Sequence, residues 1–161
     1  MSWSILSFSG GEIIRLAVQI EKAGKLFYEK AAAGVDHADV RDVLNYLATE
    51  EEKHVSDFQA LGKGLEEDVV YNESYPGEYG DYLKSLIDTH IFNENNVDDL
   101  VRGIKAPREA LAIAFRFEKD SIVIFQEFSH IVDKNGKAMI DALIEQEKEH
   151  IRKIADVARM V

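Results

Sequence analysis

The chain has 161 residues, a length that fits a single domain over residues 1–161. Of these residues 46% are hydrophobic and 30% are charged, which indicates a globular protein and argues against a disordered one. Its 30 acidic and 19 basic residues give a formal net charge of −11, so nucleic acid and anionic membranes are disfavoured as partners. The absence of cysteine excludes disulfides, iron–sulfur ligation and a cysteine nucleophile.

At the start of the chain, "MSWSILSFSG" lacks the basic and apolar regions of a signal peptide, and no apolar run approaches the roughly 18 residues of a membrane span. We therefore expect a cytoplasmic protein. Four long segments then show the apolar periodicity of helices, at about residues 10–33, 37–62, 107–133 and 136–159. Gly34 marks the end of the first, Pro107 opens the third, and "KNG" (134–136) predicts a turn before the fourth.

A long connection, residues 65–106, separates the second segment from the third. It is rich in Asn, Asp, Gly and Tyr, and its residues 79–92 are compatible with a shorter helix. Short turns join the first two long segments and the last two, so each pair is expected to form an antiparallel hairpin. The sequence thus predicts an all-α four-helix bundle of two antiparallel helical hairpins joined by a long crossover.

The two hairpins carry the same polar residues at corresponding places. "AVQIEKAGKLFYE" (17–29) resembles "AFRFEKDSIVIFQE" (114–127), and "EEEKH" (50–54) resembles "EQEKEH" (145–150). This alignment pairs Glu21 with Glu118, Glu51 with Glu147, and His54 with His150. An internal duplication explains the match, and chance similarity between amphipathic helices is the alternative.

Each of these four glutamates interrupts an apolar stripe of its helix. Glu51, for example, has Leu47 one turn before it and Phe58 two turns after it, with His54 on the same face. The stripe of the first glutamate is interrupted by Lys25. A buried carboxylate needs a proton, a partner or a metal ion, because an unpaired charge is very costly in the core.

A third Glu-x-x-His pair, Glu127 and His130, has the same spacing without the apolar stripe. Its helix face also contains Asp120 and Lys134. We interpret this pair as part of the solvated surface rather than as a ligand pair.

The position of the glutamates along the helices supports one shared site. Glu21 and Glu51 are equidistant from the turn near residue 36, and Glu118 and Glu147 are equidistant from the turn near residue 133. At 1.5 Å rise per residue, all four lie about 20–25 Å from their turns. We therefore expect them to form one layer across the bundle.

Two glutamates from single helices and two Glu-x-x-His pairs form the pattern of a di-iron carboxylate site. Carboxylate and imidazole ligands suit iron or manganese, and they do not exclude zinc. A buried polar network without metal, or two unrelated charged surfaces, are the alternatives. The expected ligands are two bridging residues, Glu51 and Glu147, and four terminal ones, Glu21, Glu118, His54 and His150.

Four segments, "AVQIEKAGKLFYE", "LATEEEKHVSDF", "AIAFRFEKDSIVIF" and "LIEQEKEHIRKI", resemble the ferritin-like superfamily and particularly the rubrerythrin family. The resemblance covers the four long segments and not the crossover. It implies a ferritin-like bundle with a non-haem di-iron site that reacts with peroxide or dioxygen. In rubrerythrins the usual reaction is the reduction of hydrogen peroxide to water with electrons from a rubredoxin-type centre.

Two departures from the rubrerythrin pattern matter. The chain has no cysteine and therefore no fused rubredoxin centre, so electrons must come from another protein. Ser121 stands where rubrerythrins usually place an extra glutamate, which makes the ligand set closer to the bacterioferritin type.

We therefore expect a rubrerythrin-type oxidoreductase with two iron ions, acting in oxidative-stress defence with an external electron donor. Tyr28, two turns after Glu21, is a candidate hydrogen-bond donor to a ligand, or else a core tyrosine. An iron buffer, ferroxidase or sensor is the second hypothesis, and a helical interaction module with a buried Glu/His layer is the third. A homodimer is the expected oligomer.

Overall fold

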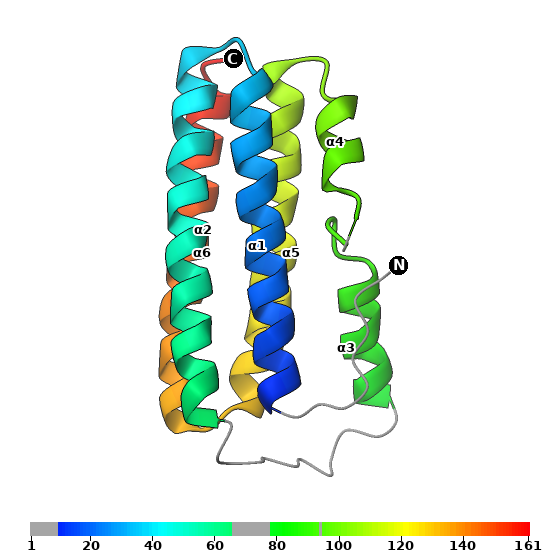
Figure 1. Ribbon diagram of the computed structural model, residues 1–161, viewed down its shortest axis with the longest axis vertical. Helices are drawn as coiled ribbons and strands as arrows, with labels where there is room; N and C mark the ends of the chain where they lie inside the picture. Colours follow the sequence, from blue (N-terminus) through cyan, green and yellow to red (C-terminus); the bar gives the residue numbers. More distant parts are fainter. Residues whose placement is uncertain (1–9, 66–77, 94) are drawn as a thin grey trace.

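The computed structural model describes residues 10–65, 78–93 and 95–161, and the secondary structure of these residues is entirely helical (Figure 1). The helices are α1 (Gly10–Gly34), α2 (Ala38–Leu65), α3 (Glu78–Asp88), α4 (Val97–Gly103), α5 (Pro107–Ile131) and α6 (Lys134–Ala158). The long helices agree with the four predicted segments to within a few residues, and the prediction of an all-α fold is confirmed.

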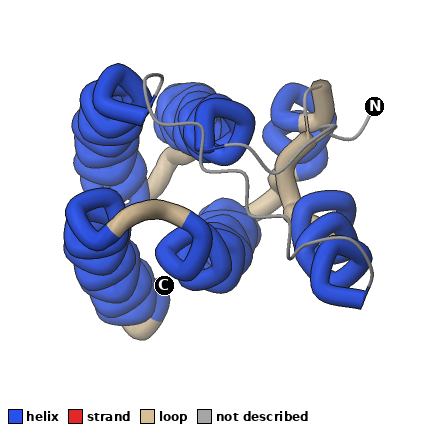
Figure 2. The backbone as a smooth tube through the Cα atoms, turned by 90° about the horizontal axis from the view of Figure 1, so that it is seen from below, coloured by secondary structure: helices blue, strands red, loops and turns tan. Residues whose placement is uncertain are grey.

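The four long helices pack as two hairpins side by side. α1 packs against α2 and α5 against α6, and the hairpins meet where α1 faces α5 and α2 faces α6 (Figure 1). Seen from below, α2 and α6 form one outer layer, α1 and α5 the middle, and the crossover helices the opposite outer layer (Figure 2). In that outer layer α4 packs on α1 and α3 packs on α5.

Two sequence-based boundaries at the second hairpin are wrong. The "KNG" triplet is not a turn but the first turn of α6, which begins at Lys134, and α5 ends at Ile131. The side chain of Asp133 explains the shift, because it accepts a hydrogen bond from the backbone N–H of Gly136 at 2.7 Å and so caps the helix. The connection between α5 and α6 is therefore only residues 132–133.

The crossover departs from its predicted structure in two ways, although its residues 66–77 and 94 lie outside the described part. The expected short helix, residues 79–92, ends earlier, at Asp88, and the following backbone is held by the N–H of Ile91 donating to Asp120 Oδ2 at 2.9 Å. The second crossover helix, α4, was not predicted, because seven residues are too few to show a clear period.

Aromatic side chains fill the core around the middle of the bundle. Phe92 from the crossover packs against Phe27 of α1 and Phe117 of α5, with ring centroids 5.2 and 4.9 Å apart. All three rings are fully buried, and each contributes about 1.5–3 kcal/mol of burial free energy. The crossover thus covers the α1–α5 side of the bundle with apolar contacts. None of the described helices combines the length and the apolar character that crossing a membrane requires.

Gly24 of α1 packs directly against the ring of Phe117 of α5. A Cβ atom built on Gly24 would overlap the ring of Phe117, which is fully buried and has no room to turn. The absence of a side chain at this position is therefore what lets the two helices pack around the aromatic cluster.

We predict that Gly24→Ala lowers the free energy of unfolding by about 1–3 kcal/mol, because the added methyl group overpacks the core. Thermal unfolding followed by circular dichroism measures the change. Gly11→Ala is the matched control, since a Cβ there meets nothing within 4 Å and alanine is the better helix former. An unchanged melting temperature for Gly24→Ala would contradict this account of the α1–α5 contact.

Candidate metal centre

All four long helices contribute to one buried polar layer. α1 supplies Glu21, α5 supplies Glu118, and α2 and α6 each supply a glutamate and a histidine three residues later. The four glutamates and His54 are 0% exposed and His150 is 1% exposed, so the expected layer exists in the core. The i to i+3 spacing places each Glu and His on one helix face, and the apolar stripes turn that face inward.

The ligand atoms form two overlapping groups, each with its atoms within 4.8 Å of one another. One group combines Glu21 and His54 with Glu51 and Glu147, and the other combines Glu118 and His150 with the same two glutamates. Glu51 and Glu147, the two residues for which the sequence predicts bridging positions, belong to both groups. The arrangement has room for two cations that share two carboxylates.

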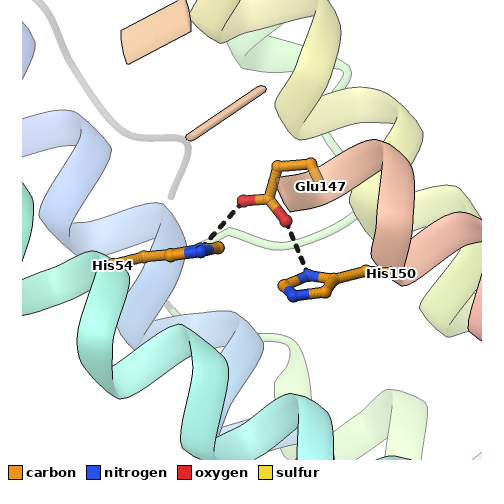
Figure 3. Close-up of side chains that lie close together, drawn as sticks. All are labelled: His54, Glu147 and His150. Carbon is orange, nitrogen blue, oxygen red and sulfur yellow. Dashed lines mark ion pairs between the residues drawn. The ribbon is translucent and has the colours of Figure 1, made fainter. Parts of the chain in front are cut away.

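Distances between the side chains show how tight the layer is. Nδ1 of His54 lies 3.0 Å from Glu21 Oε2 and 3.1 Å from Glu147 Oε1, and Nδ1 of His150 lies 2.8 Å from Glu147 Oε2 (Figure 3). Glu147 therefore stands between the two imidazoles, whose rings are nearly parallel with centroids 5.3 Å apart. Both histidines present Nδ1 to the carboxylates, which makes Nδ1 the nitrogen available to a cation.

Most carboxylate oxygens in the layer lack hydrogen-bond donors. Neither oxygen of Glu51 or Glu147 has a donor in hydrogen-bond geometry, and the same holds for one oxygen each of Glu21 and Glu118 and for Nδ1 of His150. Buried polar atoms are normally satisfied, and a buried carboxylate without partners is destabilising. Six such oxygens and an imidazole nitrogen, shared between the two overlapping groups, fit a pair of divalent cations, which suits iron.

Burial and like charge control protonation in this layer. Burial raises the pKa of Glu51 and Glu118 well above the ordinary glutamate value, and the neighbouring carboxylates raise it further. Burial lowers the pKa of His150, but the carboxylates of Glu118 and Glu147 outweigh it and raise that pKa to about 9. Burial also raises the pKa of Glu147, yet the adjacent His150 and His54 hold it below the ordinary value. Without a cation, the layer therefore retains protons at neutral pH.

Gln146 holds one of the two buried histidines, and the sequence pattern did not reveal this role. Nε2 of His54 lies 3.0 Å from the side-chain oxygen of Gln146, which accepts its N–H, and Nδ1 is therefore the nitrogen that faces the carboxylates. A hydrogen bond of this kind fixes the tautomer and the ring orientation of a metal-binding histidine. Gln146 is exposed in its own helix, so helical periodicity gave no signal for it.

Tyr28 lies at the opposite end of the layer. Its hydroxyl donates to Glu118 Oε1 at 2.5 Å, and the side chain is fully buried against the ring of Phe117. Burial, reinforced by the charge of Glu118, raises the pKa of Tyr28 well above its ordinary value, so this hydroxyl stays protonated. The structure thus places Tyr28 as a hydrogen-bond donor to Glu118, in line with one of the two roles expected from the sequence.

Ser121 is fully buried one turn after Glu118, at the position where rubrerythrins usually have an extra glutamate. Its hydroxyl faces Nε2 of His90, a crossover histidine, at 3.4 Å. Burial lowers the pKa of His90 to about 4, so this imidazole is neutral at physiological pH. The position therefore presents neutral polar groups to the core rather than a fifth carboxylate.

The Glu127 and His130 pair does not join the layer. Glu127 is half-buried and His130 is exposed, and neither belongs to a potential metal-binding group among the described residues. The structure agrees with the interpretation of this pair as surface.

We predict that metal binding releases protons and tightens as pH rises. The raised pKa of His150, about 9, keeps a proton on that imidazole at pH 7, and the raised pKa values of Glu51 and Glu118 favour their protonated forms. A cation must displace such protons, so acid weakens binding. Anaerobic titration with Mn²⁺ or Fe²⁺ in weakly buffered solution with a pH indicator measures the release. Binding that releases no protons, with an affinity constant between about pH 6 and 9, would contradict the assignment of protonation in this layer.

Comparisons with known proteins place the fold. No model of a protein family matches the chain, and no curated protein matches it either. A crystal structure of a candidate ferritin-like diiron-carboxylate protein from Thermotoga maritima is similar over 97% of this chain and 98% of that one, with a TM-score of 0.70 and 20% sequence identity. At this identity the likeness shows the fold: the chain folds as a ferritin-like helical bundle.

Proposed function

We propose that the buried layer binds two iron ions and that the protein is a non-haem di-iron oxidoreductase of the rubrerythrin type. The observation that carries the proposal is the pair of overlapping ligand groups sharing Glu51 and Glu147, whose carboxylate oxygens accept no hydrogen bond. The described diiron-carboxylate character of the Thermotoga maritima protein of the same fold supports it. Manganese and zinc are the alternative metals, because the same ligands accept them.

The substrate that fits such a centre is peroxide or dioxygen. A pair of ferrous ions supplies the two electrons that cleave an O–O bond, in the overall reaction of hydrogen peroxide with two electrons and two protons to two water molecules. An external one-electron donor, such as a rubredoxin-type protein, then returns the electrons. We propose a role in oxidative-stress defence, in the cytoplasm, in a homodimer.

The protein's own residues provide the surroundings that this chemistry requires. Four carboxylates would balance the charge of two bound cations. Gln146 holds His54, and Tyr28 holds Glu118 with a hydroxyl that remains protonated and can donate to a nearby oxygen. The aromatic cluster of Phe27, Phe92 and Phe117 keeps water from the α1–α5 side.

An iron-binding protein of ferroxidase or buffer type is the second candidate function. The observation that favours it is Ser121, which leaves the layer with four carboxylates instead of the five usual in rubrerythrins. In this case the protein oxidises or holds ferrous iron itself, and a dedicated peroxide reaction is absent.

Ligand variants test the metal site itself. We predict that the wild-type protein binds two ferrous ions per chain and that Glu51→Ala and His150→Ala lose tight binding of at least one, because each removes a ligand of the shared layer. Metal analysis after anaerobic loading measures the stoichiometry. His130→Ala is the matched control, since its Glu-x-x-His pair lies at the surface and should leave both ions in place. Full metal content in Glu51→Ala would sink the ligand assignment.

Single-turnover oxidation tests the reaction. The iron-loaded reduced protein, mixed anaerobically with hydrogen peroxide, should oxidise two ferrous ions per peroxide and develop a visible absorption band. Tyr28→Phe should keep its iron and react about 10- to 100-fold more slowly, the usual loss when a group that supports a ligand is removed. Fast oxidation by dioxygen with no preference for peroxide would instead favour the ferroxidase function.

A further inference from the structure

The layer contains two cation positions that share two glutamates and differ in their other ligands. The first position adds Glu21 and His54 to the shared pair, and the second position adds Glu118 and His150. Both positions therefore have the same kinds of ligands. A difference in affinity between them can arise only from the side chains that contact those ligands.

The two ligand histidines are held differently at Nε2, the ring nitrogen other than the one that faces the carboxylates. Nε2 of His54 lies 3.0 Å from the side-chain oxygen of Gln146, which accepts its N–H. Nε2 of His150 has no hydrogen-bond partner among the described residues, and its ring packs edge-to-face against Tyr46, with centroids 6.2 Å apart. A hydrogen bond accepted from the outer nitrogen fixes an imidazole and raises its basicity as a metal ligand. His54 is therefore the stronger and better-oriented ligand.

The two terminal glutamates differ in the same direction. Oε1 of Glu118 accepts the hydroxyl of Tyr28 at 2.5 Å, so only its Oε2 is without a donor. Oε2 of Glu21 lies 3.0 Å from Nδ1 of His54, a ligand of the same position, and its Oε1 has no donor. A hydrogen bond donated to a carboxylate stabilises its negative charge and so weakens its attraction for a proton or a cation. Glu118 is therefore the weaker of the two terminal carboxylate ligands.

We propose that the two positions are unequal: the first position binds its cation tightly and fills first, and the second position binds its cation more weakly and exchanges it. Gln146 is the positioning residue that sets this order, because it holds His54 from outside the layer. The proposal rests on the proposed function, since it assumes that the layer binds two cations. It adds a stable state with one cation, in which only the position of Glu118 and His150 is open.

Titration with Mn²⁺ followed by electron paramagnetic resonance tests the order, because a lone Mn²⁺ ion and a coupled pair give different spectra. In the wild-type protein the first equivalent should give the spectrum of a single bound ion, and the second equivalent should convert it to that of a pair. The two dissociation constants should differ by about 10- to 100-fold, the usual effect of an outer hydrogen bond on metal affinity. Equal positions would form pairs from the start of the titration.

Variants of Gln146 test its role. Gln146→Leu should weaken the tight step by about 10- to 100-fold and leave two nearly equal constants, because the imidazole of His54 loses its outer partner. Gln146→Glu keeps an acceptor for that N–H and should retain the tight step. Gln59→Leu, the same change at an exposed glutamine of α2, is the matched control and should bind as wild type. Gln146 is itself exposed, so its replacement leaves the core intact, and circular dichroism checks the fold.

Variants of the two histidines show which position fills first. His150→Ala should retain one tightly bound Mn²⁺ ion, whereas His54→Ala should retain only weak binding, because each variant leaves the other position intact. Both histidines also form a group with Glu147 (Figure 3). A first ion held between the two imidazoles would therefore lose tight binding in both variants.

The inference is overturned if the wild-type constants differ only by the statistical factor, if Gln146→Leu keeps the tight step, or if Gln59→Leu weakens it equally. Loss of tight binding in both histidine variants, or in His150→Ala alone, would overturn it as well. A protein that binds neither Mn²⁺ nor Fe²⁺ would remove the proposed function itself. Unequal binding of two ions in a protein whose ferrous iron peroxide does not oxidise would confirm the inference and remove the oxidoreductase function.

Discussion

The interaction on which the structure depends is the mutual repulsion of four carboxylates held in one dry layer. Glu21, Glu51, Glu118 and Glu147 are all fully buried, and each would raise the energy of the folded chain if it were charged and alone. The bundle therefore needs positive charge at its centre, which protons and histidines supply in part and two cations would supply fully. Folding and metal affinity are in this way coupled through the same six side chains.

Buried apolar side chains surround this costly layer. Phe58 and Phe125 pack together on α2 and α5, with ring centroids 5.0 Å apart, and the crossover adds Phe92 to the α1–α5 side. The same packing gives the layer two unlike ends. Glu118 is held by a buried tyrosine under the crossover, whereas His54 is held by a glutamine at the surface. The two ends of the layer therefore differ in how close they lie to the surface.

Much of the fold followed from the sequence because helical periodicity is local. The apolar stripes predicted the four long helices. The stripes, together with equal distances from two turns, also predicted that Glu21, Glu51, Glu118 and Glu147 lie in one layer. The periodicity missed the seven-residue helix α4, and turn chemistry misassigned the start of α6, where the capping side chain of Asp133 converts an apparent turn into a first helical turn.

The sequence by itself determined which side chains turn inward and at what depth, because both depend only on residue spacing along a rigid helix. Tertiary structure alone decided what surrounds them. Gln146 reaches His54 across the bundle, Tyr46 meets His150 between α2 and α6, and His90 enters from the crossover to face Ser121. These contacts join residues far apart in the chain. The residue pattern of a single helix does not predict which residues of other helices will contact its outer face.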